Sequence, residues 1–295
     1  MDGFLNLNKP LGITSHDCVA QVRRCLRRKR VGHGGTLDPL ATGVLPLAVG
    51  RATRLLAFLP KGKRYRATVR FGVQTNTDDL GGQILVQQPA PGLTRSAVEA
   101  VLPQFVGLIA QTPPAFSAVH IQGQRAYERA RRGETVPLPR RWVEIFAIIP
   151  EDWQAGEFPE LTLSVHCGAG TYIRSLARDI GQRLNIPAVL SGLIRTESGG
   201  MDLADSLTLE QLQAQVQTST WQLPAPDQAL THLPQVTLAP GQAQAWCQGQ
   251  NYREHLPAFP WWRVYDEQGR FLGMGRQIGE NQLKPHIVLV DPDPK

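Results

Sequence analysis

The sequence has few of the features that mark secreted, membrane or metal-binding proteins. Its four cysteines include no Cys-x-x-Cys pair, so their spacing predicts neither a disulfide framework nor a zinc site. The His166-Cys167 pair has no second pair to match it, and we expect no metal. No apolar run approaches the roughly 18 residues that span a bilayer, and residues 1–5 lack the charged and apolar regions of a signal peptide. We therefore expect a soluble, cytoplasmic protein that binds no membrane.

Nucleotide-binding motifs are missing as well. No glycine-rich segment is followed by Gly-Lys-Ser/Thr, which excludes a nucleotide-binding P-loop on pattern. No Gly-x-Gly-x-x-Gly segment opens a predicted helix, so the dinucleotide-binding fingerprint is missing too. We therefore expect a function that needs no cofactor.

The chain is long, and its charged residues are unevenly distributed. Its 295 residues are 42% hydrophobic, which is ample for a core, and the length favours two domains. Residues 1–70 carry fourteen of the 31 Lys and Arg residues but only three of the 25 Asp and Glu residues. This asymmetry indicates a polyanionic partner, and nucleic acid fits best because phosphate contacts dominate its affinity. A solvated basic face kept for solubility is the alternative.

The N-terminal part of the chain has clear local signals. Residues 4–8 predict a short strand. Thr14 and Asp17 have the spacing of a capping box and precede a pattern with helical periodicity. An apolar strand is expected at 44–49, where Pro46 favours an edge position or a bulge.

Apolar and basic side chains alternate almost perfectly from Lys63 to Phe71. This period of two is that of a half-buried strand, with Tyr65 on the apolar face and a ladder of arginines on the other. A tyrosine in this pattern is more often plain core. The position of Tyr65 near the start of the strand also allows a role in a site.

A glycine-rich loop presents a single carboxylate; it reads Gly32-His33-Gly34-Gly35-Thr36-Leu37-Asp38-Pro39-Leu40-Ala41-Thr42-Gly43. Glycine permits backbone geometries and close ligand approach that a β-carbon would block, and the following proline biases Asp38 away from helix. Asp38 is therefore a candidate reactive group facing a bulky substrate. On this stretch alone, a turn in which Asp38 caps a local N–H is the favoured alternative.

A second glycine turn leads into a helix. Residues 161–167 predict a half-buried strand, and the pattern then runs through Gly168 to Thr171 into an amphipathic helix. Arg174 falls in the first turn of this helix, where a cation opposes the helix dipole. We expect a carboxylate in a cleft to compensate this charge.

Two later segments suggest an insertion and a domain boundary. Residues 112–141 contain six arginines together with Phe116 and Tyr127. Basic groups interleaved with aromatics suit an RNA loop with unstacked bases, and an ordinary amphipathic excursion is the alternative. The proline-rich stretch 221–235 predicts a boundary, after which a small β-rich module is expected.

Five motifs occur in order along residues 3–200: Gly3-Phe4-Leu5-Asn6-Leu7-Asn8-Lys9-Pro10 with Gly12-x-Thr14-Ser15, the Asp38 loop, Lys63-x-Tyr65, Pro113-Pro114-x-Phe116-Ser117-Ala118, and Gly170-Thr171-Tyr172-Ile173-Arg174-Ser175-Leu176. Each motif is weak alone, but in this order they are very specific. Together they resemble the TruB family of bacterial tRNA pseudouridine-55 synthases. The sequence departs from the family pattern at Asn8, where an acid is common, and at His120, where lysine is usual.

The resemblance implies an α+β fold. A catalytic domain at 1–222 would be built on a large mixed, mainly antiparallel sheet, with a thumb at about 112–141 that clamps the T arm of tRNA. A small β-rich, PUA-like RNA-binding domain would occupy 235–295. The enzyme would flip out the uridine at position 55 of the T loop and isomerise it to pseudouridine without a cofactor. We expect a monomer that requires no protein partner.

The resemblance also implies the site. Asp38 would be the catalytic carboxylate, Tyr65 would stack on the flipped uracil and Arg174 would pair with Asp38. The uracil pocket and the T-loop contact would come from Tyr172, Leu193 and His33. Whether Asp38 attacks the ribose C1′, attacks the uracil C6 or removes a ribose proton stays open. Two rival hypotheses are a non-catalytic RNA-binding or folding factor, and a synthase that acts on another RNA or needs a guide complex.

Overall fold

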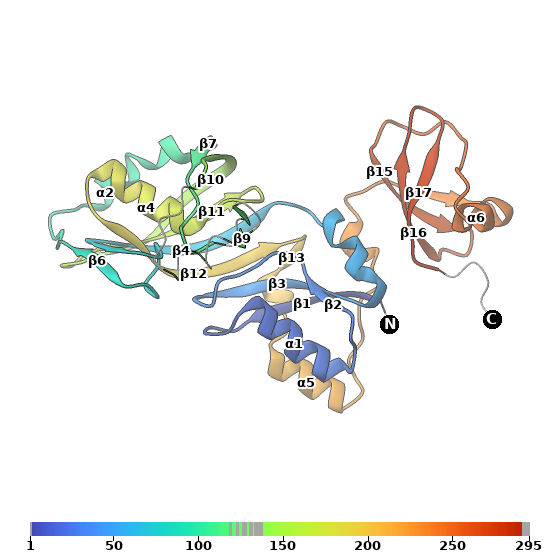
Figure 1. Ribbon diagram of the computed structural model, residues 1–295, viewed down its shortest axis with the longest axis horizontal. Coiled ribbons are helices and arrows are strands. Elements are labelled where there is room, and N and C mark those ends of the chain that lie inside the picture. Colours follow the sequence, from blue (N-terminus) through green and yellow to red (C-terminus); the bar gives the residue numbers. More distant parts are fainter. Residues whose placement is uncertain are drawn as a thin grey trace.

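The structure is a computed structural model that describes residues 2–117, 120, 121, 124, 125, 129, 132 and 138–290. A large sheet with its helices occupies one lobe, and a smaller sheet near the C-terminus forms a second lobe beside it (Figure 1). Within these residues, no helix is long and apolar enough to cross a membrane. Much of the thumb expected at about 112–141, including Tyr127, lies outside the described residues.

The large sheet has the order β1-β3-β12-β4-β11-β10-β7 in the described part of the chain, with β2 added to β3 and β13 added to β12. The strand bounds are β1 (Gly3–Lys9), β3 (Ala41–Val49), β12 (Ala188–Ser198), β4 (Lys63–Phe71), β11 (Glu160–Cys167), β10 (Arg141–Gln154), β7 (Gly107–Gln111), β2 (Val31–His33) and β13 (Met201–Asp202). Only the pairing of β12 with β3 is parallel. The predicted mixed, mainly antiparallel sheet is therefore confirmed.

Strand β4 has the predicted bounds and the predicted alternation of buried and exposed side chains. Its outward arginines, however, are all ion-paired: Arg64 with Glu197, Arg66 with Glu151 and Asp152, and Arg70 with Glu160. The acids come from the adjacent strands β11 and β12 and from β10, which lies beyond β11. This basic ladder is thus largely neutralised within the sheet and contributes little to a polyanion-binding surface.

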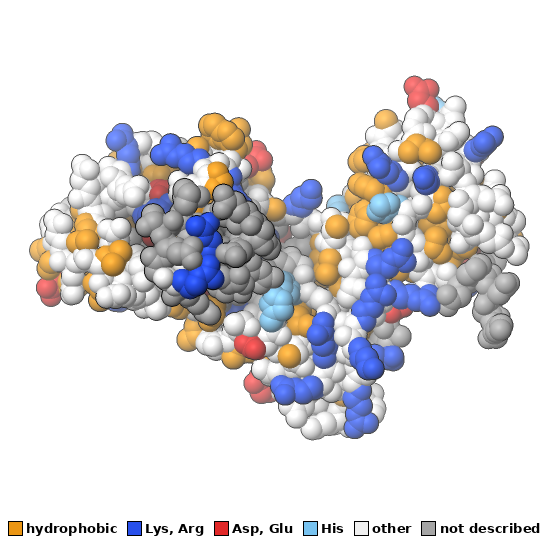
Figure 2. Space-filling model, in the orientation of Figure 1, with side chains coloured by type: hydrophobic (Ala, Val, Ile, Leu, Met, Phe, Trp, Pro, Cys, Tyr) orange, Lys and Arg blue, Asp and Glu red, His pale blue; other side chains and the backbone are white. Residues whose placement is uncertain are grey.

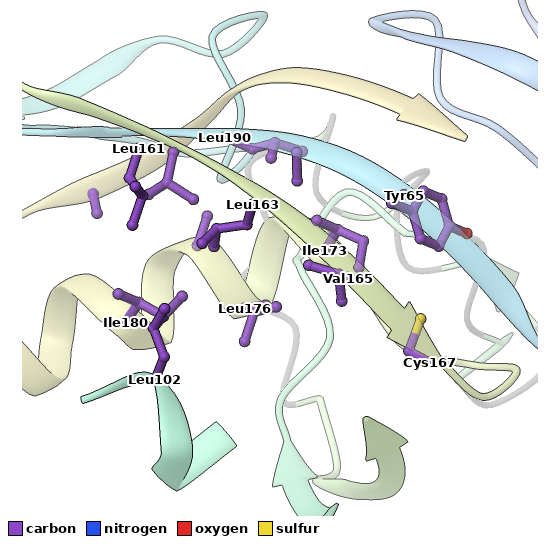
Figure 3. Close-up of a cluster of buried hydrophobic side chains, with 14 of the residues drawn as sticks. Tyr65, Leu102, Leu161, Leu163, Val165, Cys167, Ile173, Leu176, Ile180 and Leu190 are labelled. Atoms are coloured by element: carbon purple, nitrogen blue, oxygen red, sulfur yellow. The ribbon is translucent and has the colours of Figure 1, made fainter. Parts of the chain in front are cut away.

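Helices cover the two ends of the sheet. Helix α1 (Ser15–Leu26) begins at the predicted capping box of Thr14 and Asp17 and packs with α5 (Leu209–Gln217) against β1 and β3. Helix α4 (Ile173–Leu184) packs against β4, β11 and β12 (Figures 1 and 3). The core between α4 and these strands, drawn in Figure 3, runs along the length of α4, and Arg174 lies in the first turn of this helix.

The expectation that Pro46 marks an edge or a bulge is wrong. Strand β3 lies inside the sheet between β1 and β12. Its second side pairs with β12 at residues 41–43 and with β2 at residues 47–49, so Pro46 sits where β3 changes partners. A missing N–H costs nothing there, and the Pro46 carbonyl accepts a hydrogen bond from the Gly34 amide at 2.8 Å.

The remaining elements are short. They are η1 (Gly50–Phe58), β5 (Val73–Thr75), β6 (Ile84–Gln87), α2 (Arg95–Glu99), η2 (Leu102–Phe105), β8 (His120–Ile121), β9 (Gln124–Arg125), η3 (Leu203–Asp205) and η4 (Gln228–Leu230). Strands β5 and β6 pair with each other and hold the acidic turn between them.

The C-terminal sheet has the order β14-β15-β16-β17, with bounds Gln235–Leu238, Trp261–Asp266, Phe271–Gln277 and Leu283–Val288, and helix α6 spans Pro240–Cys247. It has its own core around Trp246 and Trp262. The two lobes share a further apolar cluster that includes Leu55 and Met274. In addition, Arg54 of η1 donates to the Val288 carbonyl at 2.9 Å, so the second lobe is attached through η1 (Figure 1).

Leu163 on β11 is 1% exposed in the core under α4. Replacing it with alanine leaves a cavity, and we expect Leu163→Ala to lower the free energy of unfolding by about 2–5 kcal/mol in urea titrations. Leu85 on β6 is 57% exposed and serves as the matched control, with a change of roughly 0.5 kcal/mol or less expected for Leu85→Ala. Equal losses for the two variants would contradict this assignment of the core.

Candidate active site

The Asp38 loop connects β2 to β3, and its backbone carbonyls from residue 35 to residue 39 all have hydrogen-bond donors. Arg195 donates to the carbonyls of Gly35 and Thr36 at 3.0 and 3.3 Å. The Ser15 hydroxyl donates to Leu37 at 3.0 Å, the Ala41 amide to Asp38 at 3.0 Å and the Gly12 amide to Pro39 at 2.8 Å. Because each of these carbonyls accepts a hydrogen bond, the irregular loop is held in one conformation.

Two glycines in the loop are required by its geometry. Gly35 has φ +140° and Gly43 has φ +100°, values that side chains with a β-carbon rarely adopt. A β-carbon on Gly43 would also lie 2.2 Å from the backbone oxygen of Arg195, where β3 runs beside β12. The glycines therefore serve close packing of the loop against β12, besides any approach of a ligand.

Asp38 is paired with Arg174. The Arg174 Nη2 lies 2.9 Å from the Asp38 Oδ2; the arginine side chain is 6% exposed and the aspartate side chain 41%. The cation in the first turn of α4 is thus met by a carboxylate, as expected from the helix dipole. The loop alone favoured a capped turn, but the structure turns the carboxylate towards α4 and leaves it partly open.

Arg174 also holds two other segments. It donates to the carbonyls of Thr77 at 2.9 Å and Phe116 at 3.0 Å. Its Nη1 lies 3.5 Å from the Asp79 carboxylate in the acidic turn after β5. One guanidinium therefore joins the Asp38 loop, the acidic turn and the segment that leads into residues 118–137.

A second arginine, one turn later on α4, supports the same arrangement. Arg178 pairs with Asp78 at 2.7 Å and donates to the Thr112 carbonyl at 2.8 Å. Burial raises the pKa of Asp78, and the neighbouring Arg178 opposes this shift. The acidic turn is thus fixed to α4 at both of its aspartates.

Tyr65 is buried at 6% exposure in the core that also contains Leu37 and Ala41. Burial raises the pKa of its phenol, and the nearby Arg195 opposes that shift. Figure 3 shows its ring on β4 at one end of the cluster, at the same end as Cys167 of β11. Burial raises the pKa of the Cys167 thiol to about 11, so this cysteine stays protonated at neutral pH and is a poor nucleophile.

A cleft opens beside the carboxylate. It is lined by Asp38, Leu40, Ala41, Asp79, Arg174, Leu190, Gly192 and Leu193. Leu193 lies opposite Ala41 in the register of β12 with β3 and opposite Ala67 in the register with β4. The lining of the cleft thus combines charged side chains with aliphatic ones.

The other two expected residues lie at the ends of their elements. Tyr172 is the residue before α4; its backbone is clamped by the Gln111 side chain, and its ring lies 5.9 Å from the Arg141 guanidinium carbon. His33 ends β2, and its ring is edge-on to His16 with centroids 5.2 Å apart. The structure brings Asp38, Arg174 and Leu193 to one cleft, with Tyr65 in the adjoining core.

Two residues of the site were not foreseen. Asp79 lies in the turn between β5 and β6, and no local sequence pattern assigns it to Arg174. Arg195 lies on β12, a strand that local periodicity did not predict. In the described part of the chain, no group of three or more His, Cys, Asp or Glu side chains has the arrangement of a metal site.

Comparison with protein-family models identifies both lobes. Residues 23–173 match the model described as TruB family pseudouridylate synthase (N terminal domain). The chain belongs to the TruB family. Residues 234–289 match the model described as Pseudouridine synthase II TruB, C-terminal. The family assigns an isomerase activity that forms pseudouridine.

Full-length relatives agree with the TruB assignment. Proteins named tRNA pseudouridine synthase B from Trichormus variabilis and Acaryochloris marina are 54% and 53% identical to this chain, and each match covers 98% of this chain and 99% of the relative. Among solved structures, a chain from the archaeal box H/ACA sRNP Nop10-Cbf5 complex matches with a TM-score of 0.71 and 25% identity, over 99% of this chain and 88% of that one. A chain from an H/ACA RNP bound to a substrate RNA containing 2′-deoxyuridine has a TM-score of 0.73 at 24% identity, over 99% of this chain and 86% of that one, which supports the fold alone.

His33, at the end of β2, predicts a pH effect on stability. Burial lowers the pKa of His33 from its ordinary 6.5, and His16 and Arg195 act in the same direction. As the pH falls through 6.5, the unfolded chain binds a proton that the folded chain does not, so stability falls. We expect His33→Gln to lose less stability than the wild type between pH 7.5 and pH 5.5 in urea titrations. Parallel losses in the two proteins would contradict this.

Proposed function

We propose that this TruB protein converts uridine 55 in the T loop of tRNA to pseudouridine, with Asp38 as the catalytic carboxylate. The observation that carries the proposal is the pairing of Asp38 with the buried Arg174 in a cleft that aliphatic side chains also line. The full-length relatives at 53–54% identity are named for a tRNA substrate, which supports tRNA for this chain.

The reaction is an isomerisation that balances without another reactant. The N1–C1′ bond of uridine breaks, the uracil turns within the cleft, and a C5–C1′ bond forms. The proton on C5 is lost to a base or to water, and N1 gains one. A carboxylate can serve as the nucleophile or the base in such a sequence. Asp38 can act on C1′, on C6 or on a ribose proton, and each role uses the same cleft.

The ion pair with Arg174 positions the Asp38 carboxylate to act as nucleophile or base. Arg174 binds Oδ2 through a charge-assisted hydrogen bond, which is shorter and more directional than a neutral one. The Asp38 side chain remains 41% exposed, so it can still meet a substrate from the cleft side. Positioning of a reacting group in this way is a major source of rate enhancement.

The target base must leave its stack to reach Asp38, and we propose that it flips into the cleft. Tyr65 would lie against the uracil ring, and stacking of this kind contributes about 1–3 kcal/mol per base. Leu193 and Tyr172 would form the walls of the uracil pocket, and His33 would contact the T loop.

The basic surface suits the RNA around that base. Six exposed cations follow one another at the end of α1 and just after it: Arg23, Arg24, Arg27, Arg28, Lys29 and Arg30. In Figure 2, Lys and Arg side chains spread from this region towards the C-terminal lobe. We propose that this face binds the tRNA backbone, that residues 112–141 form the thumb on the T arm, and that the module at 235–295 adds a PUA-like RNA contact.

A guide-dependent synthase is the second candidate, because the solved structures that match this chain come from H/ACA particles. The relatives with higher identity favour a protein that recognises tRNA directly. A pure RNA-binding factor is the least favoured candidate, since binding alone does not need a carboxylate paired to a buried arginine beside an aliphatic cleft.

Asp38→Asn should abolish turnover and leave tRNA binding unchanged, because the amide keeps the size of the side chain but cannot act as nucleophile or base. Tritium release from T-arm RNA labelled at C5 of uridine measures turnover, and filter binding measures affinity. Asp152→Asn is the control: it removes an exposed acid on β10 that pairs with Arg66 and should release tritium normally. A wild-type rate for Asp38→Asn would rule out the assignment.

The purified chain alone should form pseudouridine at position 55 of an unmodified T-arm RNA. Replacing that uridine with cytidine should remove the product, while a neighbouring uridine stays unmodified. Site mapping after carbodiimide treatment and primer extension gives the position. Activity that appears only with added guide RNA or protein would favour the second candidate. Comparing tRNA from strains with and without the protein extends the test to natural substrates.

A further inference from the structure

Arg195 is a buried cation whose charge is met almost entirely by backbone carbonyls. Its side chain is 0% exposed. Nε donates to the Val44 carbonyl at 2.7 Å, Nη2 to Gly35 at 3.0 Å and Nη1 to Thr36 at 3.3 Å. Among the described residues, no carboxylate lies within 4.0 Å of the guanidinium. A buried charge without an ionic partner is costly, so packing alone is a poor reason for an arginine at this position.

The three carbonyls belong to the two arms of one loop. Gly35 and Thr36 precede Asp38, and Val44 follows it in β3. The planar guanidinium, with donors pointing in fixed directions, reaches both arms at once, which a lysine ammonium on a flexible stem does less well. Arg195 and Tyr65 also lie opposite each other in the register of β12 with β4.

A second cation lies on the same side of the loop. A β-carbon placed on Gly35 would be 3.2 Å from the Lys63 Nζ and 3.7 Å from the Arg195 Nη1. The Lys63 ammonium and the Arg195 guanidinium thus both lie close to the backbone of Gly35. Like charges this close repel each other, so a buried arginine at this position is costly unless its directed donors are used.

We propose that Arg195 is a positioning residue of the active site, whose guanidinium sets the Asp38 loop and the Tyr65 ring relative to each other. Arg174 holds the carboxylate itself, while Arg195 holds the backbone that carries it. The inference rests on the proposed catalytic role of Asp38. Arg195 touches no reacting atom in this scheme.

Arg195→Lys tests the proposal, because it keeps the charge and most of the volume but loses the planar set of donors. We expect kcat for tritium release to fall about 10- to 100-fold, as a displacement of about 1 Å can cause, with KM and tRNA affinity within about threefold of wild type. Amide hydrogen exchange should quicken at residues 34–43 and remain unchanged in the C-terminal lobe. Arg70→Lys, a change on β4 at an arginine paired with Glu160, is the matched control and should keep wild-type kcat.

Each outcome decides the question. A wild-type kcat for Arg195→Lys, or a loss confined to KM, overturns the proposal. Arg195→Gln, which keeps a planar donor but no charge, is the second variant, and failure of both variants to fold, seen as lost thermal melting transitions, would assign Arg195 to the fold and overturn the positioning role. Asp38→Asn is assayed in parallel: if it stays active, the proposed function fails, whereas an inactive Asp38→Asn with a normal Arg195→Lys defeats only this inference.

Discussion

The contact between the Arg174 guanidinium and the Asp38 carboxylate is the interaction on which the rest of the site depends. It places a cation in the first turn of α4, where the helix dipole alone disfavours it, and satisfies it with acids from two other parts of the chain. Because the same guanidinium binds the Thr77 and Phe116 carbonyls, four distant segments meet at one group. Asp38, Asp79 and Arg174, which this contact brings together, line the cleft.

Local sequence predicted the elements whose signals are local. The capping box of Thr14 and Asp17 and the alternation of Lys63 to Phe71 both have their predicted form, because each depends on residues a few positions apart. Strands β10 and β12 were missed, since they are stabilised by pairing with β11, β4 and β3 rather than by a clear period of two. For the same reason the sequence supplied Asp38 and Arg174 but not Asp79 or Arg195.

The charge of residues 1–70 overstates the number of cations that a polyanion could contact in the folded protein. The basic first seventy residues include the β4 arginines, whose charges are matched by acids from later strands. Only the tertiary structure shows that these β4 arginines are ion-paired with acids from other strands, whereas the sequence shows them only as part of a basic segment. A surface that binds a polyanion is defined by the cations that remain unmatched after folding, and composition cannot make that distinction.

The parallel pairing of β3 with β12 has a consequence for synthesis on the ribosome. The Nε donor of Arg195 and the carbonyl of Val44 are separated by 151 positions in the chain. Domains fold during synthesis as their parts emerge, and contacts of such long range form late. The Asp38 loop, although encoded near the N-terminus, therefore cannot take up its final conformation until the nascent chain has been extended through β12. A product truncated before β12 would carry Asp38 without the Arg195 contacts that hold its loop.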